Sequence, residues 1–483
     1  MGECYITRRG TKTGGATEQL GIYPVGNDGR PMGNVVVPNS VSVLSDYIFQ
    51  NNANILTVVF GTDLYKINDN AFQKCTSLQE IKIPNEVSAI PQYCFDGCTS
   101  MSKIALPKNL TEISSYAFQN CSTLRTITIP DEVTNLVIKG YAFKGCSSLT
   151  NETVSKLAQL VQGSVYTYAF CGLTGITEVT TSYTNDYYFS DCTNLKKVTI
   201  LNSLSDGSFG QYVFYKCTNL IEVVLPDTAK IINRYMFSGN SKLSIINIPK
   251  SVTQIGAGAF ENCTRLNNLD IDENASFALG DSCFYNTRIT DSCAKNIIEH
   301  ALSIGDNVFR SCSSLINVEL PVFSRYMFNS CSNLKTAVST KAAESTGDEV
   351  FYDCYALTKV VIADGTKNIG SCIFDGCNSL KEVYLPSSII TATNSSLTTM
   401  SGSYYAFYNC TALEDVRLGQ DWNMSIRLNV SNNLTVDSMV AMFNSLKDLT
   451  GDTAKTLTLG ETNLSKLTDE QKAIATNKNW TLA

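Results

Sequence analysis

A single short unit recurs along most of this chain, and it restricts the fold more than any other feature. Its anchor is a phenylalanine, spaced most often by 23 residues and by 19 to 33 overall. A unit this short cannot bury an apolar face alone, so neighbouring units must stack. The anchors are Phe49, Phe72, Phe95, Phe118, Phe143, Phe170, Phe189, Phe214, Phe237, Phe260, Phe284, Phe309, Phe328, Phe351, Phe374 and Phe407.

The segment 71–90, AFQKCTSLQEIKIPNEVSAI, shows how one unit folds. Ile81 and Ile83 lie two apart and face one side of a short strand, whereas Lys82 faces the other. Pro84 ends the strand because proline cannot donate to a ladder. With Leu78, these residues match the strand signature of leucine-rich repeats. The sequence predicts an α/β solenoid, an array of about sixteen units of ~23 residues with a parallel sheet on one face.

The unit AF-x-x-C-x-x-L-x-x-I-x-I-P, clearest from Ala71 to Pro130, resembles the BspA-like class of leucine-rich repeats. This resemblance covers most of the chain. Members with a known role are mostly microbial surface adhesins that bind host matrix proteins or other bacteria. The resemblance therefore implies a binding role, but it is an analogy at the level of the fold and names no ligand.

The repeat pattern divides the chain into three parts. Residues 1–33 are rich in Gly and Thr, and we expect an extended attachment segment. Residues 34–420 form the solenoid. In residues 421–483 we expect a small α/β cap over the open end of the array, with a helix after Thr435, a strand at 456–459 and a helix opened by Thr468. This C-terminal part, and the leader MGEC-ITRRG, also resemble repeat proteins of gut Firmicutes and their prophages.

Two stretches inside the array read as helices. Asn151 to Gln162 and Asp291 to Ala301 place apolar residues three and four apart. Thr150 and Thr290 stand where N-caps would. We expect these helical turns on the convex side of the solenoid.

Composition and charge favour some locations and partners over others. The net charge is −7 and no basic stripe is present, so nucleic acid is not expected as a partner. No run of 18 apolar residues occurs, so membrane insertion is not expected. The N-terminus shows no secretory leader. We expect a cell surface or a particle released by lysis, and a cytoplasmic location stays open.

The cysteines favour structure over chemistry. Twelve share one repeat position, as expected of buried thiols that pack as small hydrophobes. Disulfide bonds and a zinc site are the weaker alternatives. The single histidine, His300, is isolated, which removes most nucleophile–base pairs. We expect no enzyme, no cofactor and no metal. The cysteines are Cys75, Cys98, Cys121, Cys146, Cys192, Cys217, Cys263, Cys312, Cys331, Cys354, Cys377 and Cys410.

Tyrosine recurs two residues before the phenylalanine anchor and supplies the candidate ligand-binding residues. Seven consecutive units carry it: Tyr93, Tyr116, Tyr141, Tyr168, Tyr187, Tyr212 and Tyr235. The same position holds Tyr47, Tyr326 and Tyr405. Two interpretations stay open, a half-buried packing ladder with wet hydroxyls and an aromatic strip that recognises a glycan or peptide.

The outward strand positions form a second row, which is either ordinary polar surface or a face suited to a protein ligand. They are Lys82, Thr128, Thr199, Val224, Asn247, Asp270, Glu319, Val361, Tyr384 and Arg417. The sequence thus favours a non-enzymatic protein that recognises a protein or glycan on a host or bacterial surface, of the adhesin or phage tail-associated type. The alternative is an intracellular structural or protein-interaction scaffold.

Overall fold

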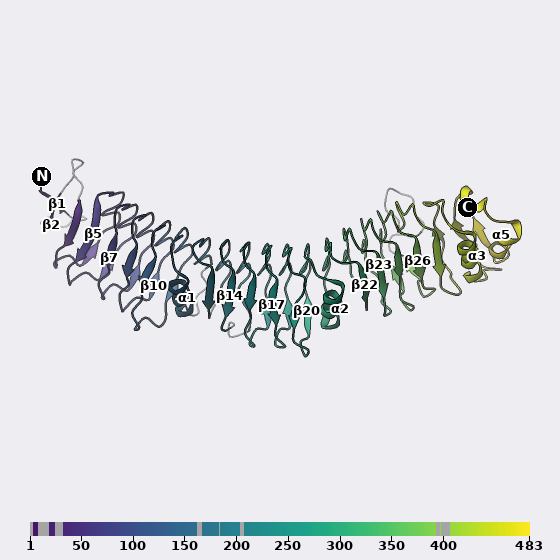
Figure 1. Ribbon diagram of the computed structural model, residues 1–483, viewed down its shortest axis with the longest axis horizontal. Coiled ribbons are helices and arrows are strands. Elements are labelled where there is room, and N and C mark those ends of the chain that lie inside the picture. The colour runs from purple at the N-terminus through teal and green to yellow at the C-terminus, as the bar shows by residue number, and fades with distance from the viewer. Residues whose placement is uncertain are drawn as a thin grey trace. The chain divides into compact units, whose positions relative to one another are not determined.

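The computed structural model describes residues 3–7, 19–24, 32–161, 167–182, 184–202, 207–392, 397 and 406–483. The chain forms a parallel-sheet solenoid of about 19 turns with few helices, which confirms the predicted fold class (Figure 1). It divides into two compact units, Met1–Ser251 and Val252–Ala483. The unit of the last anchor, Phe407, contains β28 (Asp415–Leu418), and the winding continues beyond it through α3 (Val436–Ser445) and α5 (Asp469–Thr476), so the turns outnumber the predicted units.

In the first unit the main sheet is parallel and is interrupted once, by helix α1 (Asn151–Leu160). Its strands are β3 (Gly33–Val37), β5 (Ile55–Phe60), β7 (Glu80–Lys82), β9 (Lys103–Ala105), β11 (Thr126–Thr128), β13 (Glu178–Thr181), β14 (Lys197–Ile200), β15 (Glu222–Val224) and β17 (Ile245–Ile248). Two-residue strands form a second ladder: β4 (Val43–Leu44), β6 (Lys66–Ile67), β8 (Ala89–Ile90), β10 (Glu112–Ile113), β12 (Val137–Ile138) and β16 (Ile231–Ile232). An antiparallel hairpin, β1 (Glu3–Thr7) and β2 (Gln19–Pro24), precedes them.

The second unit repeats this plan. Its main strands are β19 (Asp270–Ile271), β22 (Asn317–Leu320), β23 (Thr336–Ser339), β24 (Lys359–Val361), β26 (Glu382–Leu385) and β28, with helix α2 (Asp291–Glu299) between β19 and β22. The short strands are β18 (Gln254–Ile255), β20 (Phe277–Leu279), β21 (Ala301–Ile304), β25 (Asn368–Ile369) and β27 (Thr391–Ala392). The C-terminal part contains β29 (Ile426–Arg427), α3, β30 (Lys455–Thr458), α4 (Glu461–Leu464), α5 and β31 (Trp480–Leu482).

A tight turn around the phenylalanine anchor closes each coil and stacks on the next one through backbone hydrogen bonds. The amide of Phe95, for example, donates to the carbonyl of Ala117 at 2.8 Å. The anchor rings form a buried ladder, with neighbouring centroids 5.2–5.8 Å apart from Phe49 to Phe237. Stacked aromatic pairs at this distance add to the stabilisation from burial, so the anchors hold consecutive turns in register.

The cysteine ladder has a specific contact that explains the choice of residue. The thiol of Cys98 donates to the carbonyl of Phe72 in the preceding turn, and equivalent contacts recur at 3.0–3.3 Å in both units. Alanine would fill less space and lack the donor. All cysteines whose side chains the structure describes are buried and free, which agrees with structural thiols.

Helix α1 takes the place of a strand in the first unit. The side chain of Thr150 caps it by accepting the amide of Thr153. The side-chain oxygen of Asn151 then accepts the amides of Thr177 and Glu178, at 2.9 and 3.3 Å, where β13 begins. In turns built only from strands, carbonyl oxygens of the preceding turn fill this role. The helix thus lies in line with the sheet, and that the convex side carries the helical turns remains a prediction.

Helix α2 is joined to the following turn in the same way in the second unit. Thr290 caps it, and the carboxylate of Asp291 accepts the amides of Ile316 and Asn317, at 2.8 and 3.0 Å. The predicted C-terminal helices and strand are present as α3, α5 and β30, and Thr435 and Thr468 act as caps. That residues 421–483 seal the array and that residues 1–33 attach it remain predictions.

Candidate functional site

The seven tyrosines predicted from the spacing form a continuous stack along the first unit. We call them the tyrosine row: Tyr93, Tyr116, Tyr141, Tyr168, Tyr187, Tyr212 and Tyr235. Neighbouring ring centroids lie 4.5–5.3 Å apart, with interplanar angles of 4–20°. This spacing is close to the separation of the parallel strands that carry the turns. Regular winding therefore brings the rings together.

Every tyrosine of the row has a left-handed backbone, with φ between 51° and 64°. Residues with a Cβ adopt this conformation at a cost of about 1 kcal/mol, and asparagine and glycine tolerate it best. Other turns have Asn70, Asn307 or Gly258 at the same position. The winding of the chain therefore does not require tyrosine there.

The stack determines which parts of the rings a ligand can reach. All seven side chains are half-buried. From Tyr116 to Tyr212 both faces of each ring are covered by neighbouring tyrosines. A flat group between two rings would need a centroid separation of roughly 7 Å, which the stack does not offer. The surface available to a partner consists of ring edges and hydroxyl groups.

The hydroxyl groups are neutral donors at physiological pH. Burial raises the pKa of Tyr93, Tyr168 and Tyr187, and repulsion from a neighbouring tyrosinate raises it further. Two cations flank the rings. Lys144 Nζ lies 5.1 Å from the centroid of Tyr141, and the Arg234 guanidinium lies 5.1 Å from that of Tyr235. The row thus presents hydrogen-bond donors and positive charge.

The remaining predicted tyrosines do not extend this stack. Tyr47 has the same backbone conformation but is 56% exposed, and Asn70 occupies the next turn. In the second unit, Tyr326 packs beneath Arg325, with 4.5 Å from guanidinium to ring centroid. Tyr405 lies outside the described residues. The row therefore consists of the seven consecutive tyrosines alone.

The outward strand residues lie as predicted, and none of the ten is buried. Salt bridges cross neighbouring strands of the same face, with Lys197 and Glu222 at 2.8 Å in the first unit and Lys359 and Glu382 at 2.8 Å in the second. Each exposed ion pair of this kind contributes up to about 1 kcal/mol to the stability of the fold. This face is thus mixed in charge and shows no single chemistry that selects a ligand.

His300 has a structural position. Its Nδ1 lies 2.8 Å from the carbonyl oxygen of Asn296, at the end of α2, and its ring stacks near Phe277. Among the described residues, no group of three or more His, Cys, Asp or Glu side chains is arranged to hold a metal ion. None of the helices in the described segments has the length and hydropathy to span a bilayer.

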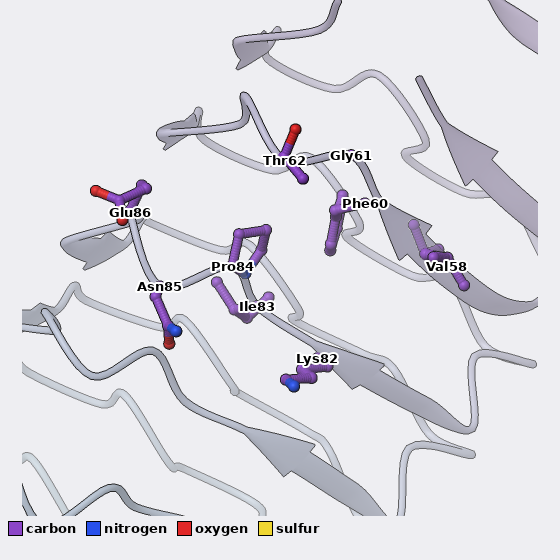
Figure 2. Close-up of a pocket in the computed structure, with 10 residues that line it drawn as sticks. Val58, Phe60, Gly61, Thr62, Lys82, Ile83, Pro84, Asn85 and Glu86 are labelled. Atoms are coloured by element: carbon purple, nitrogen blue, oxygen red, sulfur yellow. The ribbon is translucent and has the colours of Figure 1, made fainter. Parts of the chain in front are cut away.

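A depression that the sequence did not predict lies in the first unit, where β5 and β7 end (Figure 2). We call it the Phe60 pocket; its volume is about 510 Å³. Phe60 and Gly61 replace the aliphatic residue and proline found in neighbouring turns, as in Ile83 and Pro84. A Cβ on Gly61 would lie 2.5 Å from the Cα of Asn39, so glycine permits this close approach.

The lining of the Phe60 pocket is apolar in the middle and charged at its rim. Val58, Val59, Phe60 and Pro84 provide apolar surface, and Lys82, Asn85 and Glu86 surround it. The Phe60 ring is half-buried and meets Phe72 edge-on at 6.1 Å. The only sequence signal was the Phe-Gly pair at a position where the neighbouring turns have an aliphatic residue and proline, as in Val37-Pro38 and Ile83-Pro84.

Parallel strands wound around phenylalanine and cysteine ladders define a leucine-rich repeat solenoid. The family model described as "BspA type Leucine rich repeat region (6 copies)" matches residues 28–150, 137–204, 182–316, 302–401 and 323–440. These segments together span residues 28–440, and the chain belongs to the BspA-type leucine-rich repeat family.

Solved structures of similar proteins come from several bacteria. A leucine-rich repeat protein from Bacteroides ovatus is 22% identical, with 86% of this chain and 93% of that one covered and a TM-score of 0.42. A leucine rich cell surface protein from Faecalibacterium prausnitzii is 20% identical, with 84% and 95% covered and a TM-score of 0.34. The pneumococcal vaccine antigen PcpA is 14% identical, with 86% of this chain and 91% of that one covered and a TM-score of 0.36.

At these identities and TM-scores, the similarities carry no argument about function. A comparison with curated proteins found no match. Leucine-rich repeat proteins in general bind protein ligands and are typically not enzymes. The family therefore favours a binding role, without a ligand.

Proposed function

We propose that this chain is a non-enzymatic binding protein that recognises a protein or glycan on a cell surface, with the tyrosine row as its contact surface. One observation carries the proposal. Seven consecutive turns place a half-buried tyrosine at a left-handed position where asparagine or glycine has the lower conformational cost. Tyrosine offers a rigid amphipathic surface that loses little conformational entropy on binding, as recognition surfaces commonly do.

The packing interpretation explains the order of the row but not its chemistry. Six stacked pairs contribute roughly 0.5–1.5 kcal/mol each, which offsets the backbone cost of seven residues. Phenylalanine would stack equally well. Tyrosine adds a hydroxyl at the edge that the stack leaves accessible, and a hydroxyl can donate to a carbonyl of a protein or to an oxygen of a sugar.

The specific form that we favour is an adhesin or a phage tail-associated receptor-binding protein. The family relationship supports a cell-surface setting. The resemblance of the C-terminal part to prophage repeat proteins supports the phage form. In either form, residues 1–33 would attach the solenoid and residues 421–483 would cover its last turn.

A cell-binding experiment tests the proposal. The labelled chain is incubated with a panel of gut bacteria, epithelial cells and immobilised matrix proteins, beside a variant carrying Tyr116→Ser, Tyr141→Ser, Tyr187→Ser and Tyr212→Ser. Selective binding to bacteria supports the phage or coaggregation form, and binding to epithelium or matrix supports a host adhesin. Binding that is lost in the folded variant supports the tyrosine row. No binding to any surface contradicts the proposal and favours the intracellular scaffold.

A further inference from the structure

The Phe60 pocket lies beside an apolar part of the sheet face in the first unit. Val36 and Val59 point outward from paired positions of β3 and β5, and each is 56% exposed. Outward positions on later strands carry Lys82 and Thr128, and both are exposed. Two exposed valines next to a depression form an apolar surface that a partner can cover, and such surfaces mark interaction sites.

Two charged side chains at the rim of this pocket have no ion-pair partner among the described residues. In Figure 2, Lys82 lies on one side of the apolar centre and Glu86 lies beyond Asn85 on the other. Both side chains are exposed, and neither forms an ion pair or a side-chain hydrogen bond within the described segments. They are therefore free to pair with charges of opposite sign on a ligand.

The side-chain oxygen atoms of Asn85 and Thr62, the neutral polar residues of the pocket, already form hydrogen bonds. The side-chain oxygen of Asn85 accepts the amide of Lys108 at 3.3 Å, and the hydroxyl of Thr62 donates to Asp63 at 2.8 Å. A neutral sugar would need several hydrogen-bond partners to compensate for the loss of its hydration. Besides the amide nitrogen of Asn85, the side-chain groups left to a ligand are an apolar floor, one cation and one anion, which match the side chains of a peptide better than a glycan.

We propose that the Phe60 pocket binds an extended protein segment that carries an acidic, a large apolar and a basic side chain at alternate positions. Alternate residues of an extended strand share one face. The apolar side chain covers Phe60, Val59 and Pro84, while the acidic and basic side chains pair with Lys82 and Glu86. The volume of about 510 Å³ falls within the usual range for binding pockets. This inference rests on the proposed binding role and assigns it a second contact site with a peptide ligand.

Three synthetic peptides and one control peptide test the inference through fluorescence anisotropy with the full chain. The three have the sequences Glu-Thr-Phe-Thr-Lys, Glu-Thr-Phe-Thr-Glu and Lys-Thr-Phe-Thr-Lys, and the control is the first of them with Ser in place of Phe. The wild-type chain should bind the mixed peptide about fivefold more tightly than either other peptide, because each exposed ion pair contributes up to that factor. A mixed peptide with Ser in place of Phe should bind at least tenfold more weakly, because burial of the aromatic ring is lost.

Charge reversal in the protein makes the test specific to the pocket. Lys82→Glu should shift the preference to the doubly basic peptide, and Glu86→Lys should shift it to the doubly acidic one. Lys103→Glu and Glu132→Lys are matched controls, because both residues are exposed and Glu132 has the same place as Glu86 in its own turn. The controls should retain the preference for the mixed peptide.

The outcomes separate this inference from the proposed function. If no peptide binds, or if the two pocket variants and the two controls behave alike, the peptide site is wrong, whereas cell binding through the tyrosine row can still be found. If the preferences switch as expected but no cell or matrix protein is bound, the peptide site stands and the role of the tyrosine row fails.

Discussion

The opposing contributions of backbone conformation and ring stacking at the tyrosine positions can be separated by substituting asparagine. Asparagine accepts the left-handed conformation at lower cost than tyrosine, by about 1 kcal/mol. Tyr47 and Tyr141 have nearly the same φ, 61° and 60°. They differ in their neighbours, so the same substitution should have opposite effects at the two positions.

Tyr47→Asn should stabilise the protein by about 1 kcal/mol. The side chain is 56% exposed and makes no ring contact within the segments that the structure describes. The next turn already has asparagine at this position, Asn70, with φ 59°. The substitution thus removes backbone strain and little packing.

Tyr141→Asn should lower stability by up to about 2 kcal/mol. Its ring stacks on Tyr116 at 5.3 Å and on Tyr168 at 4.7 Å. Two such pairs contribute about 1–3 kcal/mol, and relief of the backbone strain returns about 1 kcal/mol. The two variants should therefore differ in the free energy of unfolding by about 1–3 kcal/mol.

Urea unfolding followed by far-UV circular dichroism measures this difference. Both tryptophans, Trp422 and Trp480, lie in the second unit, so their fluorescence does not report on the row. A stabilised Tyr141→Asn variant would show that stacking contributes less than the backbone strain. If Tyr47→Asn destabilised the protein as much as Tyr141→Asn, the left-handed backbone of tyrosine would not be the source of the expected loss of about 1 kcal/mol in stability.

Three further predictions follow from the cores and the helix junctions. Burial raises the pKa of the Cys75 thiol to about 12. The buried cysteines should therefore react with Ellman's reagent only when the protein unfolds. Rapid reaction of many thiols in the native protein would contradict the buried ladder. Asp291→Ala should lower the free energy of unfolding by about 1–3 kcal/mol, because the amides of Ile316 and Asn317 lose their acceptor. Asp291→Asn should retain most of the stability in the same urea titration. Burial, with repulsion from Asp353 and Glu349, raises the pKa of Asp375 to about 6. Since the carboxyl of the unfolded chain ionises near pH 4, the native protein loses stability as the pH rises from about 4 through 6. Asp375→Asn should therefore stabilise the protein by about 1–3 kcal/mol at pH 7 and change its stability little at pH 3.5. An equal effect at both pH values would contradict this ionisation.

The sequence was sufficient to predict the solenoid and the position of the tyrosine row. In-register stacking converts a fixed distance along the chain into a neighbour in space, so Tyr116 and Tyr141 had to come close together. The spacing did not reveal the left-handed backbone at these residues, because tyrosine is not a residue that usually signals it. It also did not reveal that stacking would leave only the ring edges accessible.

Two local features could not be placed from the repeat pattern. The helices at 151–160 and 291–299 were predicted, but not their position in line with the sheet. That position depends on the side chains of Asn151 and Asp291, which replace backbone acceptors. The Phe60 pocket depends on one Phe-Gly pair, and the pattern offered no reason to single it out among the variations between turns.

The central claim is that the accessible edge of the tyrosine row recognises a ligand. A variant with Tyr116→Phe, Tyr141→Phe, Tyr187→Phe and Tyr212→Phe keeps the stacked rings and removes four hydroxyl groups. Its binding should be measured on whichever cell or matrix surface the wild-type chain selects, with the urea midpoint of the variant as a control for folding. The account predicts a folded variant that binds at least tenfold more weakly, because several hydrogen bonds are lost. Unchanged binding by the folded variant would contradict it, and the row would then be a packing ladder.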